Sequence, residues 1–463
     1  MASRITFLFS LWIAKTLSFF ISILHLGQAS NFPGKIGLKF KKDSLKYFRF
    51  SKDCKIILIS GTNGKSTTCG LLANLLKLAK KRVIYNRSGA NLLSGINTTL
   101  CHYSSLWGNL NFDYIILETD EATLPIITKL IKPNIVLITN FFRDQLDRFG
   151  ELDKTVKLIE SGINNCNDLI LVLNADDPNV AFLNTKPDFK KYYFGININK
   201  SNESTNNHSI WISDPLEISY CPYCKKILCF HFKTLGHLGN YYCASCDFKR
   251  PKIDFLATEI KTDNLTTNFN IESNGHKTNL FLPLTGIYNL YNSLGAITIA
   301  KLTSSITNVQ IQKALQSYST IFGRGEKIKI KDKTVFVFLI KNPTGTTEVL
   351  KSLIKVDNSR FLIAINDNYA DGRDISWLWD ARFDLLSNHK DEIFVSGKRA
   401  YDMALRLKYA DIPDKLIKVN ENISTSIKDS INTLKPSETL FILPTYTVLL
   451  ELQKKGICKD MPL

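Results

Sequence analysis

The feature that most constrains this chain is a glycine-bracketed loop between a short apolar run and a helix-like segment. Residues 56–59 are apolar and indicate a buried parallel strand, and residues 69–78 place Leu and Ala at helical spacing. The loop between them reads Ser60-Gly61-Thr62-Asn63-Gly64-Lys65-Ser66-Thr67. A strand, a glycine loop and a helix N-terminus together form a phosphate cradle, in which backbone N–H groups face the anion. The pattern therefore predicts an ATP site.

The side chains of this loop have expected roles. Lys65 would reach the outer phosphates, and Ser66 would offer its hydroxyl to Mg²⁺. Ile59 stands where the first glycine of the usual P-loop would be, which leaves the shorter Gly-x-x-Gly-Lys-Ser form. A chance combination of Gly, Lys and Ser is the alternative, but the strand before the loop and the helix after it argue against chance. We therefore predict nucleotide contacts throughout Gly61, Thr62, Asn63, Gly64, Lys65, Ser66 and Thr67.

Residues 55 to 200 alternate apolar strands with helical segments, which predicts an open parallel sheet. Three further stretches indicate buried strands, each followed by polar residues: 114–117, 135–138 and 169–173. Ligands gather at the carboxyl ends of parallel strands. We therefore expect a rim of carboxylates facing the phosphate loop, drawn from 118–121, 144–147 and 176–177. Glu118 is the predicted Mg²⁺ ligand, whereas Asp120 and Glu121 fit solvated loop positions better.

Four of the ten cysteines are clustered in two Cys-x-x-Cys pairs, namely Cys221, Cys224, Cys243 and Cys246. Each pair places two thiolates on a tight turn, and four thiolates complete a tetrahedron around Zn²⁺. Such a site leaves no open position for water, so we predict a structural zinc ribbon rather than a redox pair. His231 and His237 nearby are expected to be surface or packing residues. The remaining cysteines are scattered, which fits a reducing cytosol.

Residues 5–27 form the most apolar stretch of the chain, with Lys15 near its middle. Three interpretations are open: a helix that packs on the protein or lies at a membrane interface, a spanning helix, and a secretory signal. We favour the packed or interfacial helix and place the spanning helix second. The secretory signal comes last, because an exported ATPase makes little sense.

The formal net charge of +17 suits an anionic partner. Nucleic acid, an acidic membrane surface, a pyrophosphate-bearing substrate and an acidic protein subunit all meet that requirement. The basic residues are dispersed, and no run of like charges singles out nucleic acid. Most of this charge is therefore expected to lie on a solvated surface.

A new alternation of strands and helices follows the sequence Phe-Gly-Arg-Gly-Glu at 322–326, with strand-like stretches at 334–340 and 361–365. This shift places a domain boundary near residue 320. We predict an N-terminal apolar helix at 1–35, a central ATP-binding domain at 36–318 and a C-terminal α/β domain at 319–463. The zinc ribbon would be inserted into the central domain at about 215–255.

Several motifs in this chain together resemble the Mur ligase family. They are the glycine loop, Glu118, Asn289 with Asn292, and Gly323-Arg324-x-Glu326. Within that family the chain is similar to the amidating ligase subunits, and longer strings carry this similarity: 140–150, 341–345, 366–377 and 399–408. The resemblance runs from Phe32 to residues 444–446. It implies a Mur-ligase-like α/β fold, in which a parallel-sheet ATPase domain with the inserted four-cysteine zinc ribbon precedes a C-terminal α/β domain.

The resemblance also implies a reaction in peptidoglycan synthesis. ATP would phosphorylate the α-carboxylate of D-glutamate in the lipid II stem peptide, and ammonia would attack the acyl phosphate to give D-isoglutamine. Lys65, with Mg²⁺ held by Ser66 and Glu118, would stabilise charge on the phosphates. Asn289 would lie near the nucleotide base and Arg324 near the interdomain contact with ATP. Many relatives carry a His where this chain has residues 144–147, which puts the family's second metal site in doubt here.

The nitrogen source requires a partner, because free ammonia is scarce at neutral pH. A glutaminase needs a nucleophilic Cys on a strained turn with a His base, and the adjacent Cys101 and His102 lack that turn. The resemblance implies a heterodimer with a class I glutaminase subunit (GatD-like), to which this chain donates an orienting carboxylate. Asp374 aligns with that carboxylate and Asp371 is the runner-up, although a loop cap is the alternative role for Asp374. The resemblance places the protein in the cytoplasm, at the inner face of the plasma membrane where lipid II lies.

Two rival functions remain open at this point. An amino-acid-adding ligase of the muramyl-peptide or folylpolyglutamate type would consume an amino acid without a partner. A basic zinc-ribbon ATPase that binds nucleic acid would account for the net charge and the ribbon. Against the second stands the absence of any segment that interleaves aromatic and basic residues, so no nucleic-acid partner is expected.

Overall fold

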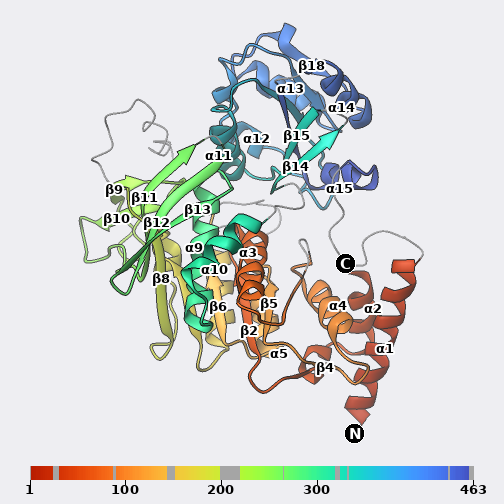
Figure 1. The fold of residues 1–463 in the computed structure, drawn as a ribbon, viewed down its shortest axis with the longest axis vertical. Coiled ribbons are helices and arrows are strands. Elements are labelled where there is room, and N and C mark those ends of the chain that lie inside the picture. Colours follow the sequence, from red (N-terminus) through yellow and green to blue (C-terminus); the bar gives the residue numbers. More distant parts are fainter. Residues whose placement is uncertain are drawn as a thin grey trace.

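The computed structural model describes residues 2–23, 31–86, 90–142, 152–198, 219–263, 265–318, 324–330, 333–435 and 438–457. Within these residues two large sheets organise the chain, one of nine strands and one of six. In Figure 1 the six-stranded sheet and its helices (teal and cyan to blue) lie above the nine-stranded sheet. The predicted α/β class with largely parallel sheets is confirmed.

The nine-stranded sheet has the order β13-β12-β11-β8-β7-β6-β2-β5-β3, and its strands from β11 to β3 are parallel. At the other edge, β12 pairs antiparallel with both β11 and β13. The bounds are β2 Lys55–Ser60, β3 Val83–Tyr85, β5 Tyr114–Glu118, β6 Ile135–Ile138, β7 Ile170–Asn174, β8 Lys190–Ile196, β11 Phe255–Asp263, β12 Thr266–Ser273 and β13 His276–Leu282. The strands expected at 114–117, 135–138 and 169–173 are thereby confirmed as β5, β6 and β7.

Hydrophobic cores lie on both faces of this sheet, because successive residues of a strand point to opposite sides. On β2, Ile57 and Ile59 belong to one core, whereas Ile56 and Leu58 belong to the other. Helices close both cores, so the central strands are continuous apolar runs. The first core is closed by α3 (Lys65–Leu78), α9 (Ile287–Thr303) and α10 (Asn308–Ser317), and the second by α4 (Leu93–Tyr103), α5 (Leu124–Leu130) and α7 (Leu152–Asn164).

The N-terminal apolar stretch forms α1 (Ala2–Ile23), which packs against α2 (Phe32–Phe40) and α4. Phe7, Leu11 and Ala14 on its inner face are buried in the second core. The window Ser3–Ile21 is long and apolar enough to cross a membrane, and 22% of that window is buried. Residues 24–27 of the predicted segment lie outside the described residues. In this structure α1 is a packed helix with one face left uncovered.

The six-stranded sheet has the order β14-β15-β19-β16-β17-β18. β14 and β15 are antiparallel, and the other pairs are parallel. Its strands are β14 Arg324–Ile330, β15 Lys333–Phe338, β16 Ser359–Ala364, β17 Ile393–Ser396, β18 Ile417–Val419 and β19 Thr439–Pro444. Its helices are α11 Pro343–Leu353, α12 Trp377–Asp380, α13 Ala400–Lys408, α14 Ile423–Asn432 and α15 Tyr446–Lys454, with 3-10 turns η4 Phe383–Leu386 and η5 Asp414–Leu416. The strands expected at 334–340 and 361–365 are confirmed as β15 and β16.

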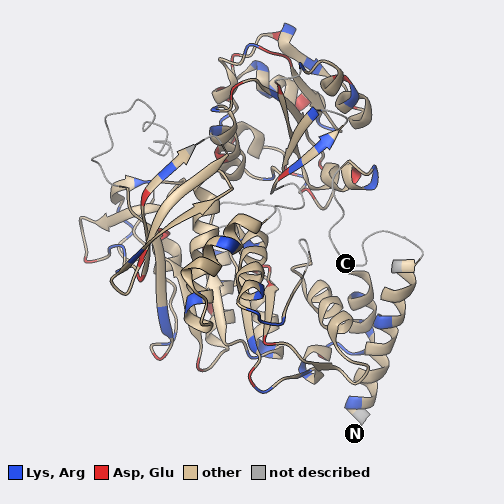
Figure 2. Ribbon diagram, in the orientation of Figure 1, with Lys and Arg blue, Asp and Glu red and all other residues tan. Residues whose placement is uncertain are grey.

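Smaller elements complete the described part of the chain. β1 (Arg49–Phe50) pairs in parallel with β4 (Asn109–Leu110), and η1 (Ser44–Tyr47) and α8 (Pro178–Ala181) are single turns. β9 (Leu228–Lys233) and β10 (Gly239–Cys243) form an antiparallel hairpin within the predicted ribbon insertion. Residues 215–218 of that insertion lie outside the described residues. Lys and Arg are spread over both sheets and the N-terminal helices (Figure 2), as the dispersed pattern in the sequence indicates.

Candidate functional site

A cavity of about 400 Å³ lies between the carboxyl ends of the β2 and β5 strands and the six-stranded sheet. Both halves of the chain contribute to its walls. The central part supplies the phosphate loop, the end of β5 and the start of α9, and the C-terminal part supplies the starts of α11 and α15. Of the seven loop residues expected to contact nucleotide, Gly61 does not line this cavity. The other six do, namely Thr62, Asn63, Gly64, Lys65, Ser66 and Thr67.

Backbone geometry explains why the loop needs its two glycines. Gly61 and Gly64 have φ values of +117° and +86°, a region that L side chains rarely adopt. A Cβ on Gly64 would lie 2.0 Å from Asn292 Oδ1, and a Cβ on Gly61 would lie 2.4 Å from Thr139 Oγ1. The backbone therefore runs against its neighbours and leaves the cavity side of the loop open.

Two residues just after the end of β6, Thr139 and Asn140, hold the phosphate loop in place by hydrogen bonds. Asn140 accepts hydrogen bonds from the N–H groups of Thr62 (2.9 Å) and Asn63 (3.0 Å). Thr139 Oγ1 donates to the carbonyl of Asn63 at 2.8 Å. Residues 143–150, which include the segment 144–147 discussed for a second metal, lie outside the described residues.

Lys65 is buried, and its side chain folds back onto the phosphate loop. Its Nζ donates to the carbonyls of Gly61 and Thr62 and lies 3.3 Å from Glu121 Oε1. Glu121 is 5% exposed, and burial raises the pKa of its carboxyl while Lys65 acts in the opposite direction. The expectation that Glu121 is solvated is therefore wrong, because the turn after β5 folds back over the lysine. Asp120 is partly exposed and lines the cavity.

Ser66 and Glu118 lie side by side at the floor of the cavity. Ser66 Oγ donates to Glu118 Oε2 at 2.5 Å. Asn86 fixes the backbone of Glu118 from both sides, accepting from its N–H at 2.6 Å and donating to its carbonyl at 2.8 Å. A hydroxyl and a carboxylate beside a phosphate cradle are the oxygen ligands that Mg²⁺ prefers, so these residues fit that ion.

The C-terminal part brings a second helix N-terminus to the phosphate loop. Asn342 caps α11 by accepting from the N–H of Gly345 at 2.8 Å, and its Nδ2 donates to Asn63 Oδ1 at 3.0 Å. Lys341 and Thr344 line the cavity next to it. Two helix N-termini that face one cavity favour anionic groups there. The sequence signal for this contribution was the Asn-Pro pair that opens α11.

The start of α9 forms another wall of the cavity. Asn289 is buried, its Nδ2 donates to the carbonyl of Thr285 at 2.7 Å, and Tyr288 and Tyr291 flank it. Leu235 of the ribbon insertion completes this wall. Arg324 opens β14, where its backbone pairs with Phe338, and its side chain lies outside the described part of the structure.

Asp176 and Asp177 do not line the cavity, which corrects their place in the expected rim. Asp176 is fully buried and accepts from Tyr291 Oη at 2.6 Å, while Arg250 Nε lies 2.8 Å away. Asp177 caps α8 and also accepts from the N–H of Phe141 at 2.7 Å. Both carboxylates therefore make their hydrogen bonds and ion pairs inside the protein. In the sequence, the Asp-Pro pair that opens α8 was the signal that Asp177 caps this helix.

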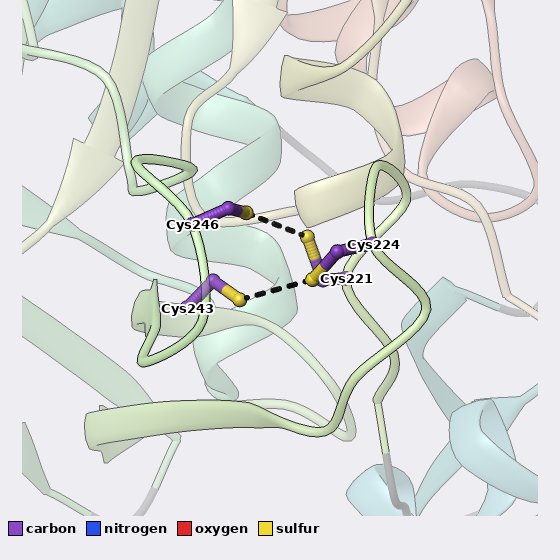
Figure 3. Close-up of side chains that lie close together, drawn as sticks. All are labelled: Cys221, Cys224, Cys243 and Cys246. Atoms are coloured by element: carbon purple, nitrogen blue, oxygen red, sulfur yellow. Dashed lines mark hydrogen bonds between the residues drawn. The ribbon is translucent and has the colours of Figure 1, made fainter.

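The four ribbon cysteines converge on one point, as Figure 3 shows. Their Sγ atoms all lie within 4.8 Å of one another, with Cys221–Cys246 at 3.6 Å and Cys224–Cys243 at 3.4 Å. A tetrahedral Zn²⁺ with Zn–S bonds of about 2.3 Å requires S–S separations of roughly 3.8 Å. The N–H of Ser245 donates to Cys243 Sγ, and this bond, together with hydrogen bonds from Cys224 and Cys246, lowers the pKa of the Cys243 thiol to about 7. The donor set therefore fits zinc.

The ribbon is tied to the cavity wall through polar contacts. Thr234 Oγ1 lies 2.8 Å from Tyr291 Oη, which in turn donates to Asp176. The N–H of Gly239, at the start of β10, donates to the carbonyl of Asp176 at 2.9 Å. His237 packs on the ring of Phe142 at 4.8 Å, as expected for a packing residue. The position of Tyr291 in the cavity thus depends on the ribbon.

The two candidate aspartates for the partner's site differ in their surroundings. Asp371 is buried in the cavity wall, accepts from the N–H and Oγ1 of Thr447 at 2.7 and 2.6 Å, and has its pKa raised by burial. Asp374 is half-buried, and its Oδ1 accepts from the N–H of Ser376 at 2.8 Å. Of the two, Asp374 is the more accessible from outside the chain.

Comparisons with known proteins match both halves of the chain. Residues 59–219 match the Mur ligase middle domain, and residues 339–449 match the MurT ligase C-terminal domain. The chain is 34% identical over 434 residues to the MurT subunit of the glutamine-hydrolysing lipid II isoglutaminyl synthase of Streptococcus pneumoniae, covering 93% of each chain. It is 32% identical over 425 residues to the corresponding subunit of Staphylococcus aureus, covering 91% of each.

Solved structures share the fold at lower sequence identity. A pseudomurein peptide ligase type C from Methanothermus fervidus superposes with a TM-score of 0.64 at 24% identity, over 89% of this chain and 80% of that one. At this level of identity the likeness supports the fold alone. It extends over both sheets described above, which agrees with the Mur-ligase-like α/β architecture.

Proposed function

The chain belongs to the MurT family of Mur ligases, and from that premise we propose that it amidates lipid II with ATP. The product would be D-isoglutamine, formed at the α-carboxylate of D-glutamate in the stem peptide during peptidoglycan synthesis. The nitrogen would come from a separate class I glutaminase subunit. The observation that carries this proposal is the cavity in which the phosphate loop, the Ser66–Glu118 pair and the N-terminus of α11 meet.

The chemistry explains why ATP is needed. A carboxylate is a poor electrophile, so a carboxylate oxygen first attacks the γ-phosphorus and the bond from that phosphorus to ADP breaks. Ammonia nitrogen then attacks the carbonyl carbon, phosphate leaves, and a proton is lost to give the amide. Mg²⁺, when bound, neutralises charge on the phosphates.

The protein's contribution to phosphoryl transfer is positioning and electrostatic stabilisation. Backbone N–H groups of the loop would hold the phosphates, and Lys65 would leave Glu121 to meet the charge that develops on them. Ser66 and Glu118 would hold the metal, Asn289 would lie near the base, and Arg324 would act at the interdomain contact. The buried position of Lys65 supports its role, because a charge interaction is stronger where water is excluded.

We assign the orienting carboxylate for the partner's catalytic residues to Asp374. Support comes from its accessibility, whereas Asp371 is buried and bonded to Thr447. The partner would therefore dock on the surface around residues 366–377 of the C-terminal part. Lipid II is membrane-linked, so the proposed enzyme works in the cytoplasm at the inner face of the plasma membrane. The amino-acid-adding alternative fits the MurT relatives less well, and no observation favours nucleic-acid binding.

The decisive experiment is a coupled assay with the purified chain, its glutaminase partner, Mg-ATP and lipid II. ADP should appear in a one-to-one ratio with amidated product when glutamine is the nitrogen donor. The chain without its partner should use ammonium chloride but not glutamine. ADP release that depends on an added amino acid, with no amidated product, would instead indicate the amino-acid-adding function.

We also assign Zn²⁺ to the four ribbon cysteines and expect a structural role. Cys224→Ser should abolish zinc retention and lower the melting temperature by about 5 °C, because metal binding contributes directly to folding free energy. It should also raise the KM for ATP, since Thr234 and Leu235 of the ribbon support the cavity wall. Zinc content, thermal unfolding and KM together check this prediction.

Cys229→Ser is the matched control for this experiment. Cys229 lies on β9 in the same hairpin, but it is outside the four-cysteine cluster. Its serine variant should keep its zinc, melting temperature and KM for ATP. If Cys224→Ser loses zinc while the KM for ATP stays unchanged, the link from the ribbon to the cavity is wrong.

A further inference from the structure

α1 carries a row of large apolar side chains on the face turned away from the protein. Most neighbours in the row are three, four or seven residues apart, with Phe19 and Phe20 adjacent, so the row runs along one side of the helix. The side chains are between 44% and 64% exposed, and they are Ile5, Phe9, Trp12, Phe19, Phe20 and Ile23. The opposite side, with Phe7, Leu11 and Ala14, is buried in the core. An ordinary surface helix would present polar residues here.

Neighbouring elements extend this apolar row into a surface. Phe40 of α2 is exposed and contacts Phe9, with ring centroids 5.5 Å apart. Trp12 Nε1 donates to the carbonyl of Leu106 at 2.9 Å, which fixes the exposed Leu106 and Trp107 beside α1. We call this surface the α1–α2 face, made of the six α1 residues above with Phe32, Phe40, Leu106 and Trp107. Contiguous apolar surface of this kind marks an interaction site.

The charge around the α1–α2 face selects its partner. Residues 1–52 contain nine Lys and Arg residues and one acidic residue, Asp43. Figure 2 shows basic and no acidic segments on α1 and α2, and Lys35 and Lys39 are exposed on α2 next to Phe40. A second copy of this chain would bring like charges together. An anionic phospholipid surface supplies both an apolar layer and opposite charge, and Trp side chains favour the boundary between the two.

The contacts on the buried side of α1 limit how deeply this helix can enter a bilayer. Ser10 Oγ donates to the carbonyl of Gly37 at 2.8 Å, and Phe7 stacks on Tyr47 and meets Phe48 edge-to-face. A spanning helix would have to leave these contacts and expose the second core. A helix that keeps them can immerse its outer face to the level of the lipid headgroups.

The α1–α2 face also lies beside the cavity. Asn31, the residue before α2, lines the cavity, and the next residue, Phe32, is exposed on the α1–α2 face. A headgroup-linked substrate held by the membrane would thus be presented at the cavity edge. This step rests on the proposed function, whereas membrane docking itself does not.

We propose that the α1–α2 face is an interfacial docking surface for an anionic phospholipid bilayer, with α1 lying in the membrane plane. The test uses the full chain, alone and with its glutaminase partner, in flotation with vesicles of phosphatidylglycerol and phosphatidylcholine. The variant Ile5→Ser/Phe9→Ser/Phe19→Ser removes three exposed apolar side chains from the face. The control Ile126→Ser/Ile227→Ser/Val309→Ser removes three exposed apolar side chains elsewhere.

The wild type and the control should float with anionic vesicles and bind pure phosphatidylcholine about 10-fold more weakly. The α1 variant should lose about 100-fold or more in partitioning. It should keep its melting temperature and its ammonia-driven amidation of a water-soluble muropeptide, so failure of docking and failure of the proposed function are distinguishable. Equal binding of the wild type and the α1 variant overturns the proposal. So does wild-type self-association without vesicle binding, or loss of vesicle binding when the partner is added.

Discussion

Lys65→Met should lower kcat for amidation by about 10³-fold with either glutamine or ammonium chloride as donor. The ammonium group is removed from a buried loop where it would meet the charge of the transferring phosphoryl group, and Met keeps most of the side-chain length. Since both donors use the same acyl phosphate, the two activities should fall together. Initial rates of ADP release and of amide formation measure the effect.

A stability control is needed for this variant, because it leaves Glu121 buried without the Lys65 charge 3.3 Å away. Breaking such a pair costs about 3 kcal/mol. In the double variant Lys65→Met/Glu121→Gln the stranded charge is gone, so the melting temperature should recover while the activity does not. Lys77→Met, at the exposed far end of the same helix, should be neutral in both measurements. Recovery of activity in the double variant would show that Lys65 serves folding alone.

Asp374→Asn should lower glutamine-driven amidation by about 10³-fold or more, while ammonium chloride still supports product. Asparagine keeps an oxygen that can accept from the N–H of Ser376, so the local turn should survive. It loses the negative charge that would orient and stabilise the partner's histidine. The activities with the two donors distinguish the two roles of Asp374. Loss with glutamine alone indicates a role in the partner's catalysis, whereas a loop cap would leave both activities intact.

Two matched variants sharpen this test. Asp380→Asn, on the exposed surface of α12, should leave both activities unchanged. Asp371→Asn should weaken amidation with both donors, because Asp371 lines the cavity and its bonds to Thr447 fix the start of α15 beside it. Equal loss with both donors in Asp374→Asn, accompanied by loss of partner binding, would reassign Asp374 to the interface.

Much of the fold could be predicted from local sequence. The parallel strands β2, β5, β6 and β7 were visible as short apolar runs, because strands covered on both faces contain few polar residues. The phosphate loop was visible because glycines at positive φ and a following helix have few substitutes. The four-cysteine cluster was visible from its spacing. The domain boundaries near 35 and 318 stay predictions.

The expected rim of carboxylates shows where local sequence was insufficient. Four acidic residues lie at or just after the ends of buried strands: Glu118, Glu121, Asp176 and Asp177. Their neighbours in the sequence do not show which of them face the cavity. The fold turns Glu118 toward Ser66 and Glu121 toward Lys65. It also pairs Asp176 with Arg250 and hydrogen-bonds it to Tyr291, residues that lie 74 and 115 positions away along the chain.

The sequence alone determined which chemistry this protein can perform, because a phosphate loop, a carboxylate after the neighbouring strand and four paired cysteines each depend on short-range spacing. The tertiary structure decided which acids meet the loop, that Asn342 reaches Asn63 from the other sheet, and that α1 keeps an apolar face uncovered. Those outcomes depend on contacts between residues far apart in the chain, and burial of a charge is favourable only where such a partner arrives.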